Sequence, residues 1–195
     1  MKRYILILIF LGVIPFACEK AEPYFEISNL TCQVYIDDSL LIQIQPTDSL
    51  SDNQVFFKID MAYDYVADNR MVHFFEFSPA LYAFSKARPG KLGLKEKLNT
   101  IKIYSDNNFN GHVAGADIKE LFKWHDVQWD GQQKPIDSLI TLLNKEAFFL
   151  GNPYYLKLIL NEKPIDSLEH TFSFDFIYEN GKHQLTNSIK INWKK

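Results

Sequence analysis

Cysteine is scarce in this chain, and basic residues do not outnumber acidic ones. The sequence has only Cys18 and Cys32 among 195 residues, with 21 lysines and arginines against 24 aspartates and glutamates. Two cysteines allow no framework of several disulfides, so a packed core must hold the fold together. The net charge of -3 argues against a nucleic-acid partner, because nucleic-acid-binding proteins carry basic patches that neutralise phosphates.

The sequence also lacks the motifs that mark common catalytic sites. It has no nucleophile elbow, no phosphate-binding glycine loop and no dinucleotide-binding fingerprint. The histidines show none of the paired spacings of zinc sites; they are His73, His112, His125, His170 and His183. We therefore assign no catalytic residue. Paired carboxylates could still meet in space as a glycosidase-like dyad, although outward-facing strand positions explain them more simply; the candidates are Asp60, Asp64, Glu76 and Asp130.

Long hydrophobic runs are missing except at the N-terminus. The apolar run there, 4–16, has about a dozen residues, fewer than the ~20 that a membrane-spanning helix needs. Lys2 and Arg3 precede it, and the small residue Ala17 stands directly before Cys18. This order of basic, apolar and small residues is typical of a cleavable export signal, so we predict that residues 1–17 are removed.

The end of this signal, Pro15-Phe16-Ala17-Cys18, resembles a bacterial lipobox, with Pro15 in the place of the usual leucine. The resemblance implies a lipid on Cys18 and attachment to a membrane, with 18–24 as a short tether. Glu19 follows the cysteine, and the resemblance to lipoprotein sorting patterns then implies the outer membrane of the cell envelope, on its periplasmic or its outer side. Acylation of Cys18 leaves Cys32 without a partner, and we interpret Cys32 as an inert, buried thiol.

Alternating apolar residues dominate the rest of the chain. Between Val55 and Tyr65 every second residue is large and apolar, which is the period of a half-buried strand. The C-terminal third repeats this period at Leu156, Leu158 and Leu160, at Phe172, Phe174, Phe176 and Tyr178, and at Leu185, Ile189, Ile191 and Trp193. Asn180-Gly181 predicts a hairpin between the last two of these segments. Further strand candidates are 25–36, 40–45, 72–77, 81–84 and 100–104.

These segments predict a single, mainly β domain that covers 25–195. The aromatic content of 15% supplies large side chains to fill a substantial core. We expect an antiparallel β-sandwich of the immunoglobulin-like or a related type, with seven to nine strands.

Two short helical patterns interrupt the strands and form one insertion, at about 114–146. In the first, Asp117 and Glu120 resemble a capping pair, and the helical face comprises Ile118, Leu121, Phe122 and His125. The second has Asp137 or Ser138 as its cap and an apolar face of Ile136, Leu139, Ile140 and Leu143. Between them, 124–134 is polar and rich in turn residues, which predicts an exposed loop. Trp124 and Trp129 in this loop are candidate contacts to a glycan or a partner protein.

One segment, 106–117, follows the spacing of a calcium-binding loop. Gly111 stands at the tight turn of position 6, His112 at position 7 and Asp117 at the closing position 12, and oxygen-bearing side chains occupy positions 1, 3 and 5: Asp106, Asn108 and Asn110. Calcium prefers oxygen ligands, but few of these carry a charge, so the predicted affinity is low. The alternative is an Asn- and Gly-rich turn that leads into a helix capped by Asp117, and such turns are commoner than metal loops.

Residues 100–122, which read TIKIYSDNNFNGHVAGADIKELF, combine a strand at Ile101 to Tyr104, the turn Asn108-Phe109-Asn110, and Ala114-Gly115 before a short capped segment. Together with the lipobox and the C-terminal hairpin, this order resembles a family of uncharacterised Bacteroidetes lipoproteins. The resemblance covers a minority of the chain. Since the family has no assigned activity, the resemblance implies a location rather than a function.

Two functions of different class are compatible with these observations. The first is a non-enzymatic binding or interaction module, tethered to the membrane by its lipid and directed at a glycan or a protein. The second is a hydrolase that acts on envelope or dietary polymers, which requires a cleft with two carboxylates or a histidine-centred dyad.

Overall fold

The computed structural model describes residues 22, 24–36, 42–51, 54–67, 89–125, 131–145 and 154–194. Several sequence predictions lie outside these ranges: the export signal with Cys18, the strands at 72–77 and 81–84, and the side chains of Glu76, Trp129 and Asp130. Within the described ranges, no helix combines the length and the apolar character needed to cross a membrane.

The fold is mainly β, as predicted, and its largest sheet has the strand order β1-β3-β7-β5-β6. Strand β1 (Tyr24–Ile36) pairs with β3 (Val55–Val66), which pairs with β7 (Tyr154–Leu160). The sheet continues through β5 (Phe122–His125) to β6 (Gln133–Pro135). All of these pairings are antiparallel, and the alternating apolar residues of β3 point into the core because alternate side chains of a strand face the same way.

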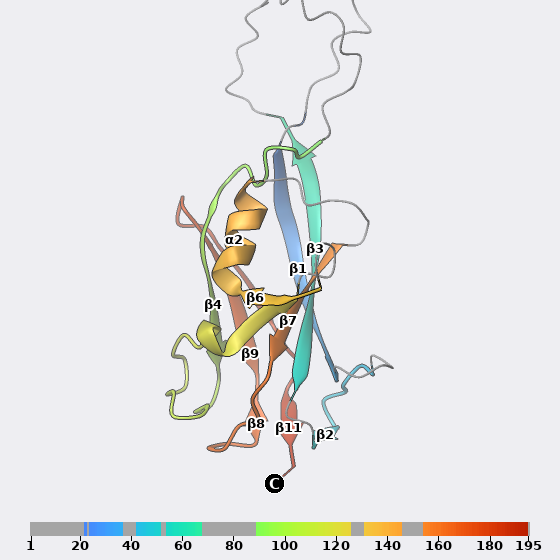
Figure 1. The fold of residues 1–195 in the computed structure, drawn as a ribbon, viewed down its shortest axis with the longest axis vertical. Helices are drawn as coiled ribbons and strands as arrows, with labels where there is room; N and C mark the ends of the chain where they lie inside the picture. Colours follow the sequence, from blue (N-terminus) through green and yellow to red (C-terminus); the bar gives the residue numbers. More distant parts are fainter. Residues whose placement is uncertain are drawn as a thin grey trace, which may run out of the picture.

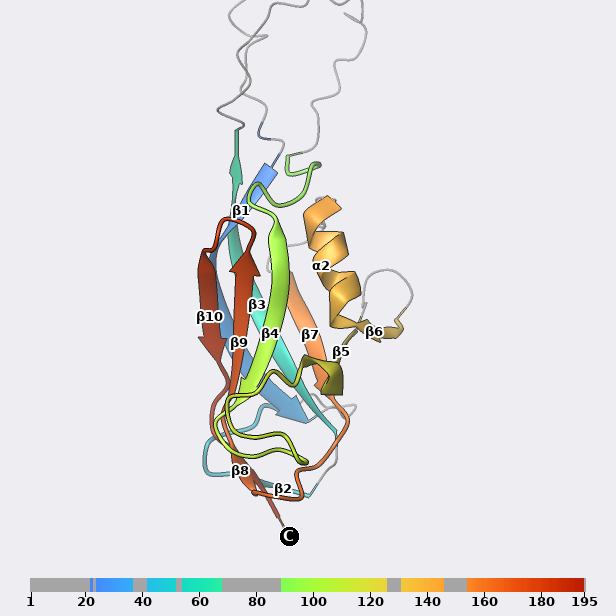
Figure 2. The ribbon, with the colours of Figure 1, turned by 90° about the vertical axis from the view of Figure 1, so that its left-hand side faces the viewer.

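A second sheet, of order β10-β9-β4, faces the first one (Figure 1 and Figure 2). Its strands are β4 (Leu98–Ser105), β9 (Phe172–Tyr178) and β10 (His183–Asn187), and their pairings are antiparallel. The core between the sheets is aromatic. The ring of Phe57 on β3 lies 5.3 Å from that of Phe172 and 5.2 Å from that of Phe174, both on β9. The two sheets therefore form the layers of a sandwich.

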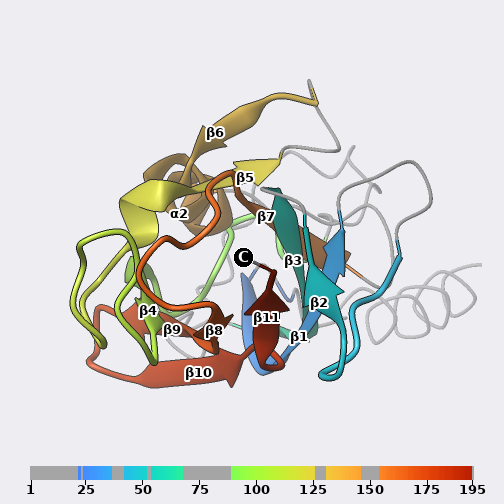
Figure 3. The same ribbon diagram turned by 90° about the horizontal axis from the view of Figure 1, so that it is seen from below.

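A third, smaller sheet lies at one end of the sandwich (Figure 3). In it, β11 (Ile191–Trp193) runs between β2 (Ser49–Leu50) and β8 (Glu169–His170), antiparallel to β8 but parallel to β2. The parallel pair departs from the purely antiparallel prediction. The described part of the chain also has eleven strands rather than seven to nine, because four of them are only two or three residues long. Immunoglobulin-like connectivity stays a prediction.

The second predicted helix is confirmed. It is α2 (Ile136–Lys145), which lies beside β4 and β5 (Figure 2) and buries the predicted face of Ile136, Leu139, Ile140 and Leu143. The helix begins before Asp137 and Ser138, so neither is its cap. Near its end, Oδ1 of Asn144 accepts the Leu98 N–H and Nδ2 donates to the Leu98 carbonyl, both at 2.8 Å. The Asn144 side chain thus pairs with β4 as a neighbouring strand would.

The first predicted helix, which starts at Asp117, is wrong. Its residues form a 3-10 turn, η2 (Lys119–Leu121), which leads directly into β5. In β5 the buried Phe122 and Trp124 alternate with half-buried residues, so the period of two prevails over the helical spacing. The predicted insertion therefore supplies two strands of the large sheet along with one helix.

The predicted C-terminal strand is divided in two. Its first half is β10 and its second half is β11, and these belong to different sheets. Because the chain changes sheet between them, Leu185 does not share a face with Ile191. Leu185 is 59% exposed, while the neighbouring Thr186 is buried.

Candidate functional site

A pocket of ≈ 230 Å³ lies beside the start of β1. Three segments line it, and their residues are Glu26 and Ile27 of β1, Leu94 and Glu96 before β4, and Tyr178, Asn180 and Lys182 of the β9–β10 hairpin. Figure 2 shows this hairpin next to the first half of β1. The pocket is therefore formed where the two main sheets approach each other at the end of the sandwich at which β1 begins.

The hairpin that forms one wall turns at Asn180-Gly181, as the sequence predicts. Gly181 has a φ of 81°, a left-handed conformation that costs other residues about 1 kcal/mol or more. Its N–H donates to the Tyr178 carbonyl (3.0 Å), and the Lys182 N–H donates to Oδ1 of Asn180 (2.9 Å). These bonds fix the backbone from which three of the lining side chains project.

Tyr178 is the buried aromatic residue of the pocket. Its hydroxyl donates to Oε1 of Gln184, and Nε2 of Gln184 donates to the Ile27 carbonyl (2.8 Å), which connects β10 to β1. Burial, together with the nearby Glu26 carboxylate, raises the pKa of the Tyr178 hydroxyl, so it stays protonated and remains a donor. The Lys182 ammonium lies 5.5 Å from the centre of the Tyr178 ring.

Two carboxylates, Glu26 and Glu96, line the same pocket, and each already has a donor from the chain. Nζ of Lys95 lies 3.1 Å from Oε1 of Glu26, and Nδ2 of Asn180 donates to Oε2 of Glu96 (3.2 Å). The pocket thus combines hydrogen-bond acceptors, an ammonium group and apolar side chains. Such a mixture suits a small ligand with several polar groups.

The segment proposed as a calcium loop is organised around a tight turn and a buried ring. Asn110 (φ 47°) and Gly111 (φ 86°) are both left-handed, and the flanking Phe109 and His112 exchange two backbone hydrogen bonds of 2.9 Å. This is the geometry of a type I′ turn, which Asn-Gly favours. The Phe109 ring is fully buried, 5.1 Å from the ring of His170, and anchors the segment to the core.

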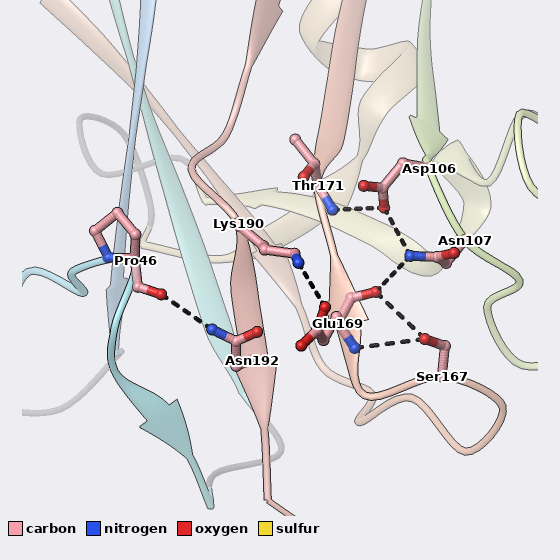
Figure 4. Close-up of polar contacts among 8 residues, drawn as sticks. All are labelled: Pro46, Asp106, Asn107, Ser167, Glu169, Thr171, Lys190 and Asn192. Atoms are coloured by element: carbon pink, nitrogen blue, oxygen red, sulfur yellow. Dashed lines mark hydrogen bonds and ion pairs between the residues drawn. The ribbon is translucent and has the colours of Figure 1, made fainter.

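The proposed calcium ligands all accept backbone hydrogen bonds in this structure. Each side-chain oxygen accepts a backbone N–H: Asp106 accepts that of Thr171 (2.7 Å), Asn108 that of Ala114 (3.0 Å), Asn110 that of Ile165 (2.9 Å) and Asp117 that of Ile103 (3.1 Å). The His112 carbonyl accepts the Phe109 N–H. Figure 4 shows Asp106 reaching Thr171, with Asn107 beside it bonded to the Glu169 carbonyl.

A calcium ion at 106–117 would have to share oxygens that already accept these hydrogen bonds. Among the residues that the structure describes, no group of three or more His, Cys, Asp or Glu side chains is arranged to hold a metal ion. Calcium binding therefore stays a prediction.

Trp124 does not lie in an exposed loop, and that prediction is wrong. Trp124 belongs to β5, its side chain is only 3% exposed, and its Nε1 donates to Oγ of Ser138 (2.7 Å). A side chain enclosed in this way cannot contact a glycan or a partner. The end of the predicted loop, 133–134, belongs to β6 instead.

The carboxylates proposed as a hydrolytic dyad are not paired where the structure describes them. Asp60 and Asp64 lie on the outward face of β3, and their separation of four residues corresponds to about 13 Å along a strand. A glycosidase dyad requires a separation of roughly 5–10 Å. Asp60 instead pairs with Lys58, whose Nζ lies 3.0 Å from Oδ1. Glu26 and Glu96, which were not among the sequence candidates, both line the pocket described above.

Sequence reasoning missed a contact between Ser105 and His170, whose positions are far apart in the chain. Oγ of Ser105 lies 2.7 Å from Nδ1 of His170, and Nε2 of His170 lies 2.8 Å from the Ser167 carbonyl. Burial lowers the pKa of His170, which favours the neutral ring. Both side chains are buried, so a substrate cannot reach them. We interpret the pair as a core hydrogen bond between β4 and β8.

Cys32 is half-buried rather than fully buried, and the inertness of its thiol stays a prediction. It is a free cysteine on β1, and burial, with a smaller effect of Asp60, raises its pKa to about 12. The thiol is therefore almost entirely protonated at neutral pH, whereas nucleophilic cysteines need a thiolate.

No family model, no curated protein and no solved structure matches the chain.

Proposed function

We propose that this protein is an exported lipoprotein, anchored through Cys18 to the outer membrane of the cell envelope, whose β-sandwich is a non-enzymatic binding module. The order of basic, apolar and small residues before Cys18 supports the anchor. The resemblance of residues 100–122 and the lipobox to Bacteroidetes lipoproteins supports the same location. Replacement of Cys18 by serine should abolish incorporation of a labelled fatty acid and release the protein from the membrane fraction, and retained label would contradict the anchor.

The pocket between β1 and the β9–β10 hairpin is the observation that carries the binding role. Its polar lining residues come from three separate segments, and its volume of ≈ 230 Å³ is below the roughly 300–1,000 Å³ of pockets for drug-sized ligands. A pocket of this size holds one small ring or side chain. We propose that it takes a single sugar residue of a glycan, because hydroxyl groups can both donate to Glu26 and Glu96 and accept from Lys182.

Titration calorimetry with envelope and host glycans tests this role. Loss of a hydrogen bond to a charged group costs roughly 1.5–3 kcal/mol, so Glu96→Gln and Lys182→Gln should each weaken binding by about tenfold or more. Glu179→Gln is the matched control, because Glu179 lies on the same hairpin, is exposed and does not line the pocket. If a glycan binds all three variants with the same affinity, the pocket is not its binding site.

A hydrolase is the second candidate, because Glu26 and Glu96 share one pocket. A glycosidase needs one carboxyl group as a proton donor, whereas both of these carboxylates already accept from Lys95 or Asn180. Turnover of chromogenic glycosides decides between the two functions. We expect none from the wild type, and turnover that disappears in both Glu26→Gln and Glu96→Gln would establish the hydrolase instead.

A further inference from the structure

Two loops at the end of the sandwich opposite the start of β1 are bonded to each other. We name residues 106–117 and 161–168 the loop pair. Nδ2 of Asn110 donates to Oε2 of Glu162 (3.0 Å), and its Oδ1 accepts the Ile165 N–H (2.9 Å). The Gly111 N–H donates to Oδ2 of Asp166 (2.7 Å). Figure 3 shows the two loops next to each other at this end. Together with the buried ring of Phe109, these bonds fix the conformation of the loop pair.

The loop pair exposes two large aliphatic side chains. Ile165 is 81% exposed and Val113 is 69% exposed, the two highest values among the exposed large apolar residues of the described chain. Single exposed apolar residues are ordinary on protein surfaces. Here two of them stand on neighbouring loops whose backbones are held by hydrogen bonds. Binding through such preformed loops costs little conformational entropy, and aliphatic side chains on them are suited to enter a partner's pocket.

The charge of the loop pair is negative. Its acidic residues are Asp106, Asp117, Glu162 and Asp166, and its only lysine or arginine is Lys163, which is half-buried. Glu169 nearby is already paired with Lys190, at 2.5 Å between Nζ and Oε2. Lys163 and Asp166 are the charged residues nearest to Ile165 in the sequence, and the loop pair as a whole has more acidic than basic side chains. An exposed apolar side chain on an acidic surface is complementary to an apolar pocket with a basic rim.

The position of the loop pair also points to a partner rather than to the membrane. The chain enters the fold at Tyr24, at the opposite end from these loops (Figure 1). If Cys18 carries the anchor proposed above, the tether to Tyr24 is short, so the loop pair faces away from the lipid. This step alone rests on the proposed anchor, while the exposure and the charge do not.

We propose that the loop pair is a docking surface for a second protein, whose binding site is an apolar pocket rimmed by lysine or arginine, with Ile165 and Val113 as the inserted side chains. The site is distinct from the sugar pocket, which lies at the other end of the sandwich. Ile165 is the principal contact because it is the more exposed of the two and is followed directly by the acidic Asp166.

A phage-displayed library of random peptides, selected on the full chain in detergent, provides the probe. We expect enriched peptides that combine an aliphatic or aromatic residue with lysine or arginine, and that bind more weakly at high salt. Ile165→Ser should weaken their binding by about tenfold or more, since a buried aliphatic side chain contributes that much. Leu185→Ser is the matched control, because Leu185 is an exposed aliphatic residue outside the loop pair, and it should leave binding unchanged. Both variants should keep the wild-type melting temperature.

Other outcomes overturn the proposal. Peptides that bind Ile165→Ser as tightly as the wild type, or enriched peptides that are acidic, exclude a basic-rimmed partner at this surface. If the wild type self-associates in sedimentation velocity and Ile165→Ser does not, the loop pair binds a second copy of this chain instead. If the wild type binds phosphatidylglycerol vesicles and Ile165→Ser does not, the loop pair binds a lipid bilayer instead. Unchanged glycan affinity of Ile165→Ser shows that the pocket acts independently, so a failure here leaves the sugar-binding proposal standing.

Discussion

Replacement of Asn110 by glycine should loosen the loop pair while keeping its turn. Glycine adopts the φ of 47° at this position without strain, so the type I′ turn survives. The substitution removes the side-chain bonds to Glu162, to the Lys163 carbonyl and to the Ile165 N–H. Three partly exposed hydrogen bonds at roughly 0.5–1 kcal/mol each amount to about 2 kcal/mol of local stability. Asn110→Ala should lose about 1 kcal/mol more, because a left-handed φ strains alanine.

Amide hydrogen exchange at Ile165 measures this effect directly, since its N–H donates to Asn110. A local loss of about 2 kcal/mol corresponds to exchange roughly thirtyfold faster in Asn110→Gly, with the amides of β9 unchanged. Asn108→Gly is the matched control, because Asn108 bonds to Ala114 within its own loop and not to the second loop. If Ile165 exchanges as fast in the wild type as in Asn110→Gly, the loops are not held together by Asn110 and the argument for a preformed docking surface fails.

Four further outcomes follow from the same structure. Asn144→Ala should lower the free energy of unfolding, measured in urea, by about 2–3 kcal/mol, because the buried N–H and carbonyl of Leu98 lose their hydrogen-bond partner. A change below about 0.5 kcal/mol would contradict the pairing of Asn144 with β4. Burial lowers the pKa of His170 below its ordinary 6.5, so the unfolded chain binds a proton at this imidazole more readily than the folded chain, and the free energy of unfolding falls as the pH drops below about 6.5. His170→Asn should therefore lose less stability between pH 7 and pH 5 than the wild type. Equal losses would refute the lowered pKa of His170. The melting temperature should be the same in EDTA and in millimolar calcium, because the described residues form no cluster of acidic side chains for a metal and Oδ1 of Asp106 already accepts the Thr171 N–H. A shift that Asp106→Ala removes would establish the calcium site. Cys32 should resist iodoacetamide at pH 8 in the native protein and react in urea, since a pKa of about 12 leaves little thiolate, whereas rapid native labelling would show that the thiol is accessible and ionised.

The fold could be predicted where one period dominates a segment. The alternation from Val55 to Tyr65 has a single interpretation, and β3 extends over it. The helical spacing of Ile136 to Leu143 likewise matches α2. Residues 118–125 were ambiguous, because Phe122 fits both the helical and the alternating period. The neighbouring strands determine that this segment is a strand, because β7 and β6 supply backbone partners on both sides of β5. The local sequence of 118–125 does not predict these partners.

The candidate sites were harder to predict than the fold. Asn180-Gly181 marks the hairpin, but the pocket needs Glu26 and Glu96 as well, and only sheet packing brings these together with the turn. The calcium template fitted residues 106–117 through the spacing of their oxygens, yet spacing does not tell which donors those oxygens face. In the fold they face backbone amides of distant segments, such as those of Thr171 and Ile165. Polar spacing alone is therefore compatible with both a turn and a metal loop, and only the greater frequency of turns favours the first.

The placement of β11 between β2 and β8 has a consequence for the order of events during folding. Asn192 pairs with Ser49, so β11 completes a sheet with a strand that lies 143 residues earlier in the chain. Such distant pairing slows folding, because a long loop must close before any contact forms. Until residues 191–193 take their place, β2 and β8 have no partner within this sheet, because each pairs there with β11 alone. One strand of three residues therefore holds together two segments that lie more than a hundred residues apart in the chain.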